Sequence, residues 1–550
     1  MNIVTAQLNY TIGDLSGNTQ KIIDVIRLHA DSADLIVFSE LCVTGYYPKD
    51  LLDRSGFIED QLLAIDRIKV ATEHSKAAVV LGTVKRNPFA GKPYVNALEL
   101  IEDGQTVYQY TKQLLPTYGV FDEARHFEPG NQPGLFKWKD IRIGFLICED
   151  AWEDENSPLY QRNPIAQLEG NELDVVISIN ASPYNIYKRS TRHTIMSTIA
   201  KRCACPVFYV NQVGGIDDLV FDGNSMVFDQ TGACCFEAPM FEEDVSRIDS
   251  TQLVPIAIER TDHMERIAKQ LVLGLKDYCE KSGFKKVVIG SSGGIDSAVT
   301  LAIASLAMGA ENVTAITMPS RYSSAGSVDD SVELCNALGV ELYNSPIKST
   351  FDAEIQSYIA TFDEPPSSLG QENLQARIRG QRLMTYSNST GAMVVSTGNK
   401  TEMSVGYCTL YGDMAGGVSL LADLYKGQVY ELAEYLNESI FGAEVIPNAI
   451  INKEPSAELA EDQVDSDALP PYDQLDAYLQ ILLEEDLLSN KEIALLSATA
   501  GLLSGREKTR IGELLDRNEY KRRQAAPVIR VNRRSFGADR QIPLTLKMTS

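Results

Sequence analysis

Short runs of hydrophobic residues recur through the first half of the chain: NIVTAQL, DLIVFSEL, AAVVLGTV, IRIGFLICED, LDVVISINAS and PVFYVNQV. Runs of this length that are rich in Val and Ile predict buried strands, and the stretches Lys21–Ala30 and Pro164–Leu168 between them predict helices. Turn signals at Asp103-Gly104 and near Thr231-Gly232 predict β-hairpins. The pattern therefore indicates an α/β domain with mixed sheets.

A different pattern starts at Lys285, where strands and helices alternate regularly. We expect strands at Val287–Gly290, Val313–Met318 and Val340–Pro346, and helices at Ser297–Met308 and Ser327–Leu338. This βαβαβ order predicts a parallel sheet with right-handed crossovers, in which ligands bind at the carboxyl ends of the strands. The loop that follows the first of these strands lies at such an end.

Length and composition agree with more than one folded domain. The chain has 550 residues, of which 44% are hydrophobic and 23% charged, and a usual size of about 100 to 200 residues per domain predicts roughly two to four domains. Strong periodicity is lost and acidic residues accumulate around residues 240 to 265. We expect a first domain at residues 1–245, a linker at 246–265 and a second domain at 266–550.

The formal net charge of -25 argues against nucleic acid and membranes as partners, because both surfaces are negatively charged and would repel the protein. No apolar run approaches the ~20 residues that span a bilayer, and the amino terminus does not have the pattern of a secretion signal. We therefore expect a cytoplasmic protein. The nine cysteines lack paired CxxC spacing, which indicates free thiols. All five histidines precede residue 264, so we expect the second domain to work without histidine.

The loop VVIGSSGGIDSAV, at Val287–Val299, combines glycines, serines and one acid. Its glycines and serines are Gly290, Ser291, Ser292, Gly293, Gly294 and Ser297. Glycines let backbone N–H groups approach an anion, and hydroxyls add donors. The spacing fits neither the Walker nor the dinucleotide-binding pattern. A carboxylate beside polyphosphate needs a bridging cation, so we interpret Asp296 as a Mg²⁺ ligand. Alternatively, Asp296 or Ser297 only caps a helix.

The core of this loop, SSGGIDSA, resembles the phosphate loop of the ATP-pyrophosphatase superfamily. Farther along the chain, QENLQARIRGQRLM, STGNKTEMSVGYCTLYGDMAGG, DLYKGQVYELA and KEPSAEL resemble segments of the NAD synthetases within that superfamily. The motifs occur in the family's order and cover essentially all of residues 265–550. The resemblance implies a Rossmann-like domain with a parallel sheet that splits ATP into AMP and pyrophosphate, with Mg²⁺, to activate deamido-NAD.

The same resemblance implies roles for individual residues. The implied ATP contacts are Gly290, Ser291, Ser292, Gly293, Gly294, Asp296, Ser297, Thr397 and Lys426. The implied Mg²⁺ ligands are Asp296 and Glu402. The implied deamido-NAD contacts are Asn373, Arg377, Glu402 and Lys521. Relatives that use ammonia alone usually have lysine before YGD, whereas this chain has Leu410, so position 410 is given no role.

A basic segment fits this interpretation independently of the family. Lys521–Arg540 contains seven basic residues and one acid in an otherwise acidic chain. A local positive patch suits a dianionic dinucleotide and acts within one Debye length, ~8 Å in physiological salt. A solvated basic tail has the same composition.

In the first half, Glu40, Lys112 and Cys148 each follow a predicted strand. Individually, the first two are explained as surface charges and the cysteine as core filler. Together, in FSELCVTGY, YTKQLLPTYGVFDEARHF and ICEDAW, they resemble the Glu-Lys-Cys amidases of the nitrilase superfamily, which implies an αββα sandwich. The resemblance implies that Cys148 is the nucleophile, that Lys112 favours its thiolate, and that Glu40 is the general base.

The nitrilase resemblance also implies how an amide substrate is held. The implied glutamine contacts are Tyr118, Glu123, Glu149, Ser182 and Lys188, of which Glu123 is a second, supporting carboxylate. Lys112 and the backbone N–H of Glu149 would stabilise the oxyanion of the tetrahedral intermediate.

Together the two halves resemble the family of glutamine-dependent NAD(+) synthetases, ligases that take ammonia from glutamine. The resemblance implies glutamine, ATP and deamido-NAD as substrates, channelled ammonia, and a homo-oligomer. Another ATP pyrophosphatase that uses ammonia, such as a GMP synthetase, is disfavoured because those enzymes pair with a Cys-His-Glu glutaminase. A nucleotide-sensing or scaffold protein with an inactive amidase is the alternative of a different class, and an assay of glutamine hydrolysis separates it from an enzyme.

Overall fold

The computed structural model describes residues 1–73, 75–152, 159–258, 261–461 and 463–546. The chain forms two compact units, Met1–Arg260 and Thr261–Ser550. Residues 259, 260 and 547–550, which fall in the expected linker and second domain, lie outside the described residues. All helices within the described part of the chain are too short or too polar to cross a membrane.

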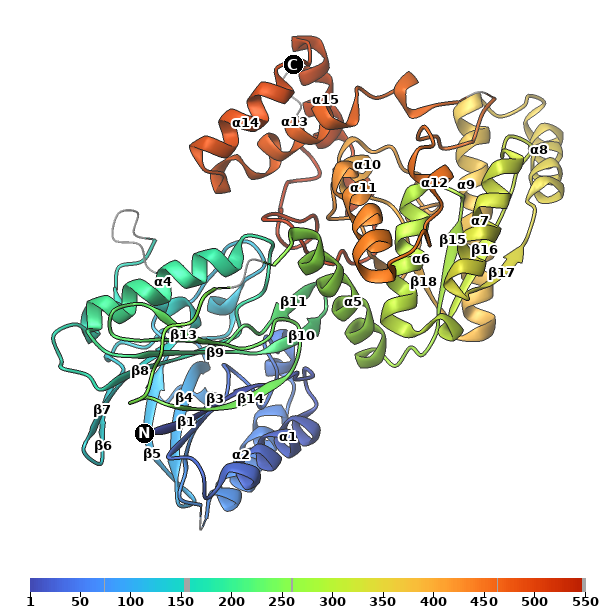
Figure 1. Ribbon diagram of the computed structural model, residues 1–550. Helices are drawn as coiled ribbons and strands as arrows, with labels where there is room; N and C mark the ends of the chain where they lie inside the picture. The colour runs from blue at the N-terminus through green and yellow to red at the C-terminus, as the bar shows by residue number, and fades with distance from the viewer. Residues whose placement is uncertain (74, 153–158, 259–260, 462, 547–550) are drawn as a thin grey trace. The chain divides into compact units, whose positions relative to one another are not determined.

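The first unit is built on two six-stranded sheets (Figure 1). The first sheet has the order β14-β1-β2-β3-β4-β5, and its strands are β1 (Asn2–Gln7), β2 (Leu35–Val37), β3 (Ala78–Arg86), β4 (Tyr94–Glu102), β5 (Gln105–Thr111) and β14 (Asp244–Asp249). The second has the order β13-β12-β9-β8-β7-β6, and its strands are β6 (Leu135–Trp138), β7 (Ile141–Ile147), β8 (Val175–Asn180), β9 (Val207–Asn211), β12 (Met226–Phe228) and β13 (Cys234–Glu237). A small hairpin is formed by β10 (Val213–Ile216) and β11 (Leu219–Asp222).

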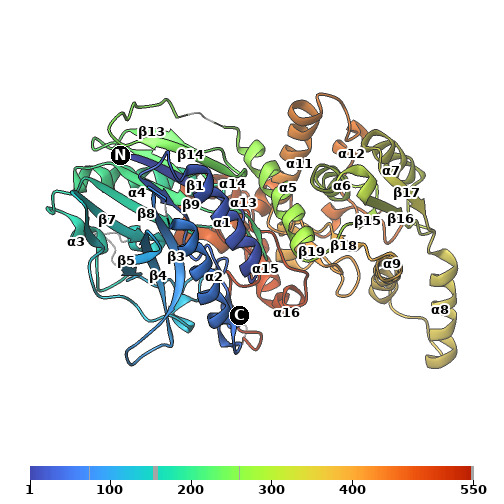
Figure 2. The same cartoon turned by 90° about the horizontal axis from the view of Figure 1, so that it is seen from below.

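Helices cover the outer face of each sheet, as Figures 1 and 2 show. The helices of this unit are α1 (Leu15–His29), α2 (Phe57–Thr72), α3 (Pro164–Leu168) and α4 (Lys188–Cys203). Ile26 of α1 and Ile65 of α2 pack on the first sheet, and Met196 of α4 packs on the second. Between the sheets, Leu98 and Ile177 belong to one shared core. The unit is therefore the αββα sandwich that the resemblance implied.

Two sequence predictions for this unit can be compared directly with the structure. Both predicted hairpins are confirmed: Asp103 and Gly104 join β4 to β5 with φ of 46° and 74°, as a two-residue turn requires, and β12 pairs antiparallel with β13 across the turn that contains Thr231 and Gly232. The expected linker is wrong at its start. Residues 244–249 form β14 and pair with β1, so this part of the chain completes the first sheet.

The second unit contains a fully parallel five-stranded sheet, as predicted. Its order is β17-β16-β15-β18-β19, and its strands are β15 (Val287–Ser291), β16 (Val313–Thr317), β17 (Glu341–Asn344), β18 (Met393–Ser396) and β19 (Val418–Ser419). The helices near it are α5 (His263–Lys281), α6 (Ile295–Met308), α7 (Ala325–Leu338), α8 (Lys348–Phe362), α9 (Ser368–Thr390), α10 (Lys400–Val405), α11 (Lys426–Tyr435) and α12 (Asn448–Ile451). Four more follow: α13 (Tyr472–Glu484), α14 (Asn490–Ala500), α15 (Gly505–Arg517) and α16 (Glu519–Arg522).

The sheet of the second unit is covered on both faces, which explains the continuous apolar runs of its strands. Figure 2 shows α6 and α7 on one face and α9 on the other. On the α9 side, Ile378 and Phe351 pack against Val288 and Val394 of the sheet. The loop between β15 and α6 consequently lies at the carboxyl ends of the strands, where the sequence placed it.

Candidate active sites

The three predicted catalytic residues of the first unit all follow strands. Glu40 comes after β2, Lys112 after β5 and Cys148 after β7, so two sheets contribute to one site. Glu40 and Lys112 are completely buried, and Cys148 is 5% exposed. Surface charge is therefore the wrong interpretation of Glu40 and Lys112.

Lys112 connects two carboxylates. Its Nζ lies 2.7 Å from Glu40 Oε1 and 2.6 Å from Glu123 Oε1. All three side chains are fully buried, so each charge depends on the others for compensation. The predicted supporting carboxylate is thus placed beside the predicted base and lysine.

Further hydrogen bonds orient both carboxylates. Asn96 Nδ2 donates to Glu40 Oε1 at 2.7 Å, and the backbone N–H of Ala181 donates to Glu40 Oε2 at 2.9 Å. Tyr46 donates its hydroxyl to Glu123 Oε1 at 2.7 Å. Neither Asn96 nor Tyr46 was predicted from the sequence, because each bonds to a residue far away along the chain: Asn96 is 56 residues from Glu40, and Tyr46 is 77 residues from Glu123.

Burial controls the protonation of this site. Burial, together with the negative charge of Glu40, raises the pKa of the Cys148 thiol well above its ordinary value, and Lys112 does not offset this. Burial also raises the pKa of Glu40 to about 7, against the opposing effect of Lys112. Burial opposes the charge of Lys112 itself, but the neighbouring carboxylates outweigh it and raise its pKa. The raised pKa favours the protonated thiol of Cys148, so its attack on a substrate requires a base, the role that the resemblance implies for Glu40.

Asp150 fixes the turn that carries the nucleophile. Its Oδ1 accepts hydrogen bonds from the backbone N–H groups of Gln113 and Leu114, at 3.0 and 2.9 Å. Its Oδ2 accepts from the N–H of Ile147 at 3.1 Å and from the hydroxyl of Tyr110 at 2.8 Å. One buried carboxylate thereby ties the residues after the catalytic lysine to the residues around the catalytic cysteine. Asp150 was not predicted as a site residue, although it stands within the ICED motif that contains Cys148.

The predicted glutamine contacts surround this centre. Tyr118 and Tyr160 both donate hydroxyls to Glu149 Oε1, at 2.8 and 2.9 Å. Lys188, the first residue of α4, places its Nζ 3.6 Å above the ring of Trp152. The structure therefore brings Tyr118 and Glu149 into direct contact, and contact with glutamine remains a prediction for all of them.

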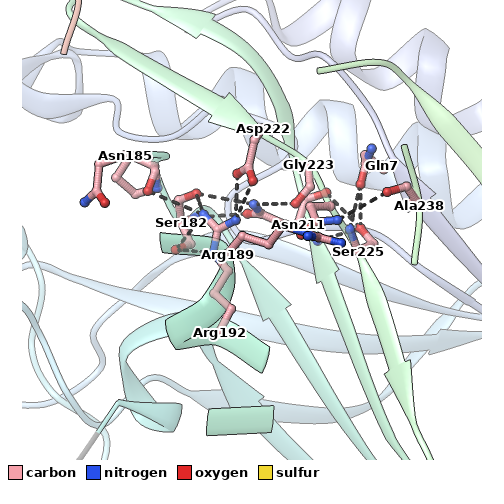
Figure 3. A network of polar contacts seen from close by, with 12 residues as sticks. Gln7, Ser182, Asn185, Arg189, Arg192, Asn211, Asp222, Gly223, Ser225 and Ala238 are labelled. Carbon is pink, nitrogen blue, oxygen red and sulfur yellow. Dashed lines mark hydrogen bonds and ion pairs between the residues drawn. The ribbon is translucent and has the colours of Figure 1, made fainter. Parts of the chain in front are cut away.

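Ser182 follows β8 and is held by a polar network (Figure 3). Its backbone N–H donates to Asn211 Oδ1 at 2.9 Å, and its carbonyl accepts from Arg192 Nη2 at 2.7 Å. Arg192 in turn forms a fully buried ion pair with Asp222. Arg192 and Asp222 were not predicted, because nothing nearby in the chain distinguishes them from surface charges.

In the second unit, a pocket lies at the carboxyl ends of β15, β16 and β18. Most of the predicted ATP and metal residues line it: Gly290, Ser291, Ser292, Gly294, Asp296, Thr397, Glu402 and Lys426. Gly293 and Ser297 belong to the same loop and are not part of the pocket wall. The loop predicted from its composition thus forms one side of an open pocket.

Packing, as well as anion binding, requires a glycine in this loop. Gly293 has φ of 74°, and a Cβ there would lie 2.3 Å from the carbonyl oxygen of Ser327. Ser297 Oγ donates to the carbonyl of Gly294 at 2.9 Å and lies 3.1 Å from Ser292 Oγ. The hydroxyls of Ser292 and Ser297 therefore shape the loop from within.

The two predicted metal ligands, Asp296 and Glu402, both contact the ammonium group of Lys426. Lys426 Nζ lies 2.6 Å from Asp296 Oδ2 and 3.1 Å from Glu402 Oε1. Asn399 donates its side-chain amide to Asp296 Oδ1 at 3.0 Å. The alternative that Asp296 only caps a helix is therefore wrong, since its carboxylate points to other side chains. Burial raises the pKa of Glu402 to about 7, and the nearby charge of Asp296 adds to the effect.

This arrangement fits Mg²⁺ bound together with a nucleotide. Mg²⁺ in nucleotide sites is held by one or two carboxylates, and phosphate oxygens and water complete its octahedron. Asp296 and Glu402 provide two carboxylates in the wall of one pocket, next to the glycine-rich loop. The electrostatic need for a cation between them is met here by Lys426.

The three predicted deamido-NAD residues outside the pocket meet at another segment. Arg377 Nε donates to the carbonyl of Leu410 at 3.2 Å, and Asn373 Oδ1 accepts from Thr409 Oγ1 at 2.7 Å. Lys521 Nζ donates to the carbonyls of residues 406 and 408, both at 2.8 Å. All three thus hold residues 406–410, and their contact with deamido-NAD remains a prediction.

The basic segment Lys521–Arg540 is not a free positive patch. Each of its arginines has an acidic partner within the unit. The pairs are Arg522 and Arg523 with Glu519, Arg530 with Asp539, Arg533 with Glu492, Arg534 with Asp486, and Arg540 with Glu519 and Asp516. The predicted patch is therefore wrong for the arginines.

Comparison with known proteins matches both units to families. The carbon-nitrogen hydrolase family matches residues 3–254, and the NAD synthase family matches residues 267–525. A glutamine-dependent NAD(+) synthetase of Synechocystis is 40% identical over 562 aligned positions that cover 98% of each chain. One from Thermotoga maritima is 37% identical and covers 99% of this chain and 98% of its own.

A solved structure agrees with these relatives. The glutamine-dependent NAD+ synthetase of Acinetobacter baumannii, solved in complex with adenosine diphosphate, is 39% identical, with a TM-score of 0.77. The alignment covers 99% of this chain and 98% of that one. Because such similarity extends over nearly the whole length of several relatives, the chain belongs to the family of glutamine-dependent NAD(+) synthetases.

Proposed function

We propose that the protein converts deamido-NAD, ATP and glutamine into NAD, AMP, pyrophosphate and glutamate. The observation that carries this proposal is the buried Glu40–Lys112 pair next to Cys148 in a chain whose second unit has a nucleotide-type loop. The first unit would supply ammonia, which is mostly protonated and not nucleophilic at neutral pH. We further propose that the ammonia is channelled to the second unit, and that the protein is a cytoplasmic homo-oligomer.

In the first unit, Glu40 takes the proton of the Cys148 thiol as sulfur attacks the carboxamide carbon of glutamine. The oxyanion is stabilised by Lys112 and the backbone N–H of Glu149. The carbon–nitrogen bond then breaks, Glu40 returns the proton to the departing ammonia, and a thioester remains. Water, deprotonated by Glu40, attacks the thioester and releases glutamate and the thiol. The pKa of Glu40, about 7, suits a group that both accepts and returns a proton.

In the second unit, the carboxylate of deamido-NAD attacks the α-phosphorus of ATP and displaces pyrophosphate. Backbone N–H groups of the loop at Gly290–Gly294 would hold the phosphates. Asp296 and Glu402 would hold Mg²⁺, whose charge stabilises the phosphates as pyrophosphate leaves. When those carboxylates hold Mg²⁺, the ammonium group of Lys426 would be released from them and would face the phosphate oxygens. Ammonia then attacks the adenylated carboxyl carbon, and AMP leaves to give the amide of NAD.

The test separates the two half-reactions. Cys148→Ala should abolish NAD synthesis from glutamine, since deletion of a catalytic nucleophile costs up to ~10⁶ in kcat in other hydrolases. Ammonium salt at mildly alkaline pH should restore synthesis to the rate that the unmodified protein shows with the same salt. NAD and AMP are measured together by chromatography.

A second buried cysteine of the first unit gives a matched control. Cys205→Ala removes a buried thiol from the core beneath α4 and should leave glutamine-driven synthesis unchanged. Loss of ammonium-driven synthesis in a folded Cys148→Ala protein would refute this division of labour.

A further inference from the structure

Arg192 lies near the proposed glutaminase centre without belonging to the predicted catalytic set. It is on α4, is completely buried, and lies opposite Asp222 at the end of β11. Figure 3 shows its side chain reaching from the helix toward Ser182 and Asp222. A buried arginine is costly unless every donor is paired, so its contacts indicate its purpose.

All donors of Arg192 are engaged within the protein. Nη1 donates to both oxygens of Asp222, at 2.6 and 2.8 Å. Nη2 donates to the carbonyl of Ser182 at 2.7 Å, with longer contacts to Ser182 Oγ at 3.2 Å and to the carbonyl of Pro183 at 3.4 Å. Nε donates to Ser182 Oγ at 3.3 Å. With its five N–H groups used in this way, Arg192 is suited to hold the chain and not to bind substrate.

The segment that Arg192 holds serves the proposed reaction at two points. The N–H of Ala181 donates to Glu40 Oε2 at 2.9 Å, so the position of this segment affects the base. Ser182 Oγ accepts from the guanidinium, so its own proton points away from Arg192, toward Tyr209 or toward an acceptor on a bound substrate. Asn211 supports the same segment, because its Oδ1 accepts from the N–H of Ser182 at 2.9 Å.

We infer that Arg192, fixed by Asp222, is a positioning residue for glutamine: it holds residues 181–183 so that Ser182 Oγ faces the substrate and Ala181 orients Glu40. The inference rests on the proposed glutaminase function. Lysine cannot replace this arginine fully, since one ammonium group cannot reach Asp222 and two atoms of Ser182 in the same planar fork.

The test is a kinetic comparison in the full-length protein. Arg192→Lys should raise the KM for glutamine about tenfold, the effect of weakening one well-placed hydrogen bond, with a smaller loss in kcat. Ammonium-driven NAD synthesis should keep its normal rate. A double variant with Ser182→Ala should be no worse than the more impaired single variant, because both changes remove the same contact.

Controls distinguish positioning from general damage. Arg202→Lys alters another arginine of α4, which pairs with Glu169, and should leave the KM for glutamine unchanged. If Arg192→Lys does not accumulate as folded protein, Asp222→Asn takes its place, with the same expected rise in KM. A normal KM for glutamine in the folded variant, or fully additive effects in the double variant, would overturn the inference. Failure of the unmodified protein to hydrolyse glutamine would instead contradict the proposed function.

Discussion

Lys112 Nζ lies 2.7 Å from Glu40 Oε1, and both side chains are fully shielded from solvent. The ammonium favours the ionised form of Glu40, but burial acts more strongly and the charge of Glu123 adds to it, so the pKa of Glu40 is raised to about 7. Since Glu40 accepts the thiol proton only when ionised, kcat/KM for glutamine should fall about tenfold per pH unit below that value. A pH profile of glutamate release checks this limb.

Glu123→Gln should move the acidic limb of that profile to lower pH. The negative charge of Glu123 raises the pKa of Glu40, so its removal lowers that pKa and keeps the base ionised in more acidic solution. Glu99→Gln is the control, because Glu99 is a buried acid of β4 whose ion pair is with Lys85. A limb that stays in place or moves upward would show that Glu123 does not act on Glu40 through its charge.

Asp150→Asn should lower the kcat of glutamine hydrolysis by about ten- to a hundredfold, because buried hydrogen bonds to a charged acceptor are worth ~1.5–3 kcal/mol. An asparagine that keeps the bonds to Gln113 and Leu114 turns its NH₂ toward the N–H of Ile147, where two donors then meet. Asp174→Asn, at an exposed aspartate that accepts from one backbone N–H, should have no such effect. Wild-type kcat in Asp150→Asn would argue against its role at the nucleophile.

Asp296→Asn should abolish pyrophosphate release that depends on deamido-NAD, by a factor of at least ~10². The amide leaves Lys426 without the carboxylate that lies 2.6 Å from it, and leaves the proposed Mg²⁺ with one carboxylate. Glutamine hydrolysis should persist. Asp352→Asn on α8, where an exposed aspartate pairs with Lys348, is the control. Near-normal adenylation by Asp296→Asn at limiting magnesium would contradict the metal role.

Lys521→Ala should raise the KM for deamido-NAD more than the KM for ATP. Its ammonium holds the carbonyls of Gly406 and Cys408, so its loss loosens the segment to which Asn373 and Arg377 also bind. Arg534→Gln breaks the pair with Asp486 and should change neither KM. If Lys521→Ala raises the KM for deamido-NAD and the KM for ATP equally, Lys521 has no specific role in binding the dinucleotide.

The sequence predicted best what depends on neighbouring residues. The runs Ile141–Ile147 and Val175–Asn180 are almost entirely buried, which is why their strands could be located from hydrophobicity alone. The Asp103-Gly104 turn could be predicted because positive φ at both positions favours those two residues. The family resemblance added Glu40, which composition alone would place on the surface.

The features that could not be predicted from the sequence depend on contacts with residues far away along the chain. The strand Asp244–Asp249 alternates polar and apolar residues weakly and is defined by pairing with the start of the chain. Asp150 differs from a surface acid through the hydrogen bonds that its carboxylate accepts from Tyr110, Gln113 and Leu114. Arg534 seemed available to a ligand because its partner, Asp486, lies outside the basic segment in which it was counted.

The pairing of β1 with β14 also determines the order in which the first unit can be completed during synthesis. Residues 2–7 leave the ribosome long before their antiparallel partners at 244–249, which are among the last of the unit to appear. Until then one edge of β1 has unpaired N–H and C=O groups, the kind of edge that recruits other chains. A fragment that stops at residue 245 would leave residues 2–5 of this edge without their partners, whereas one that extends past residue 249 can close it.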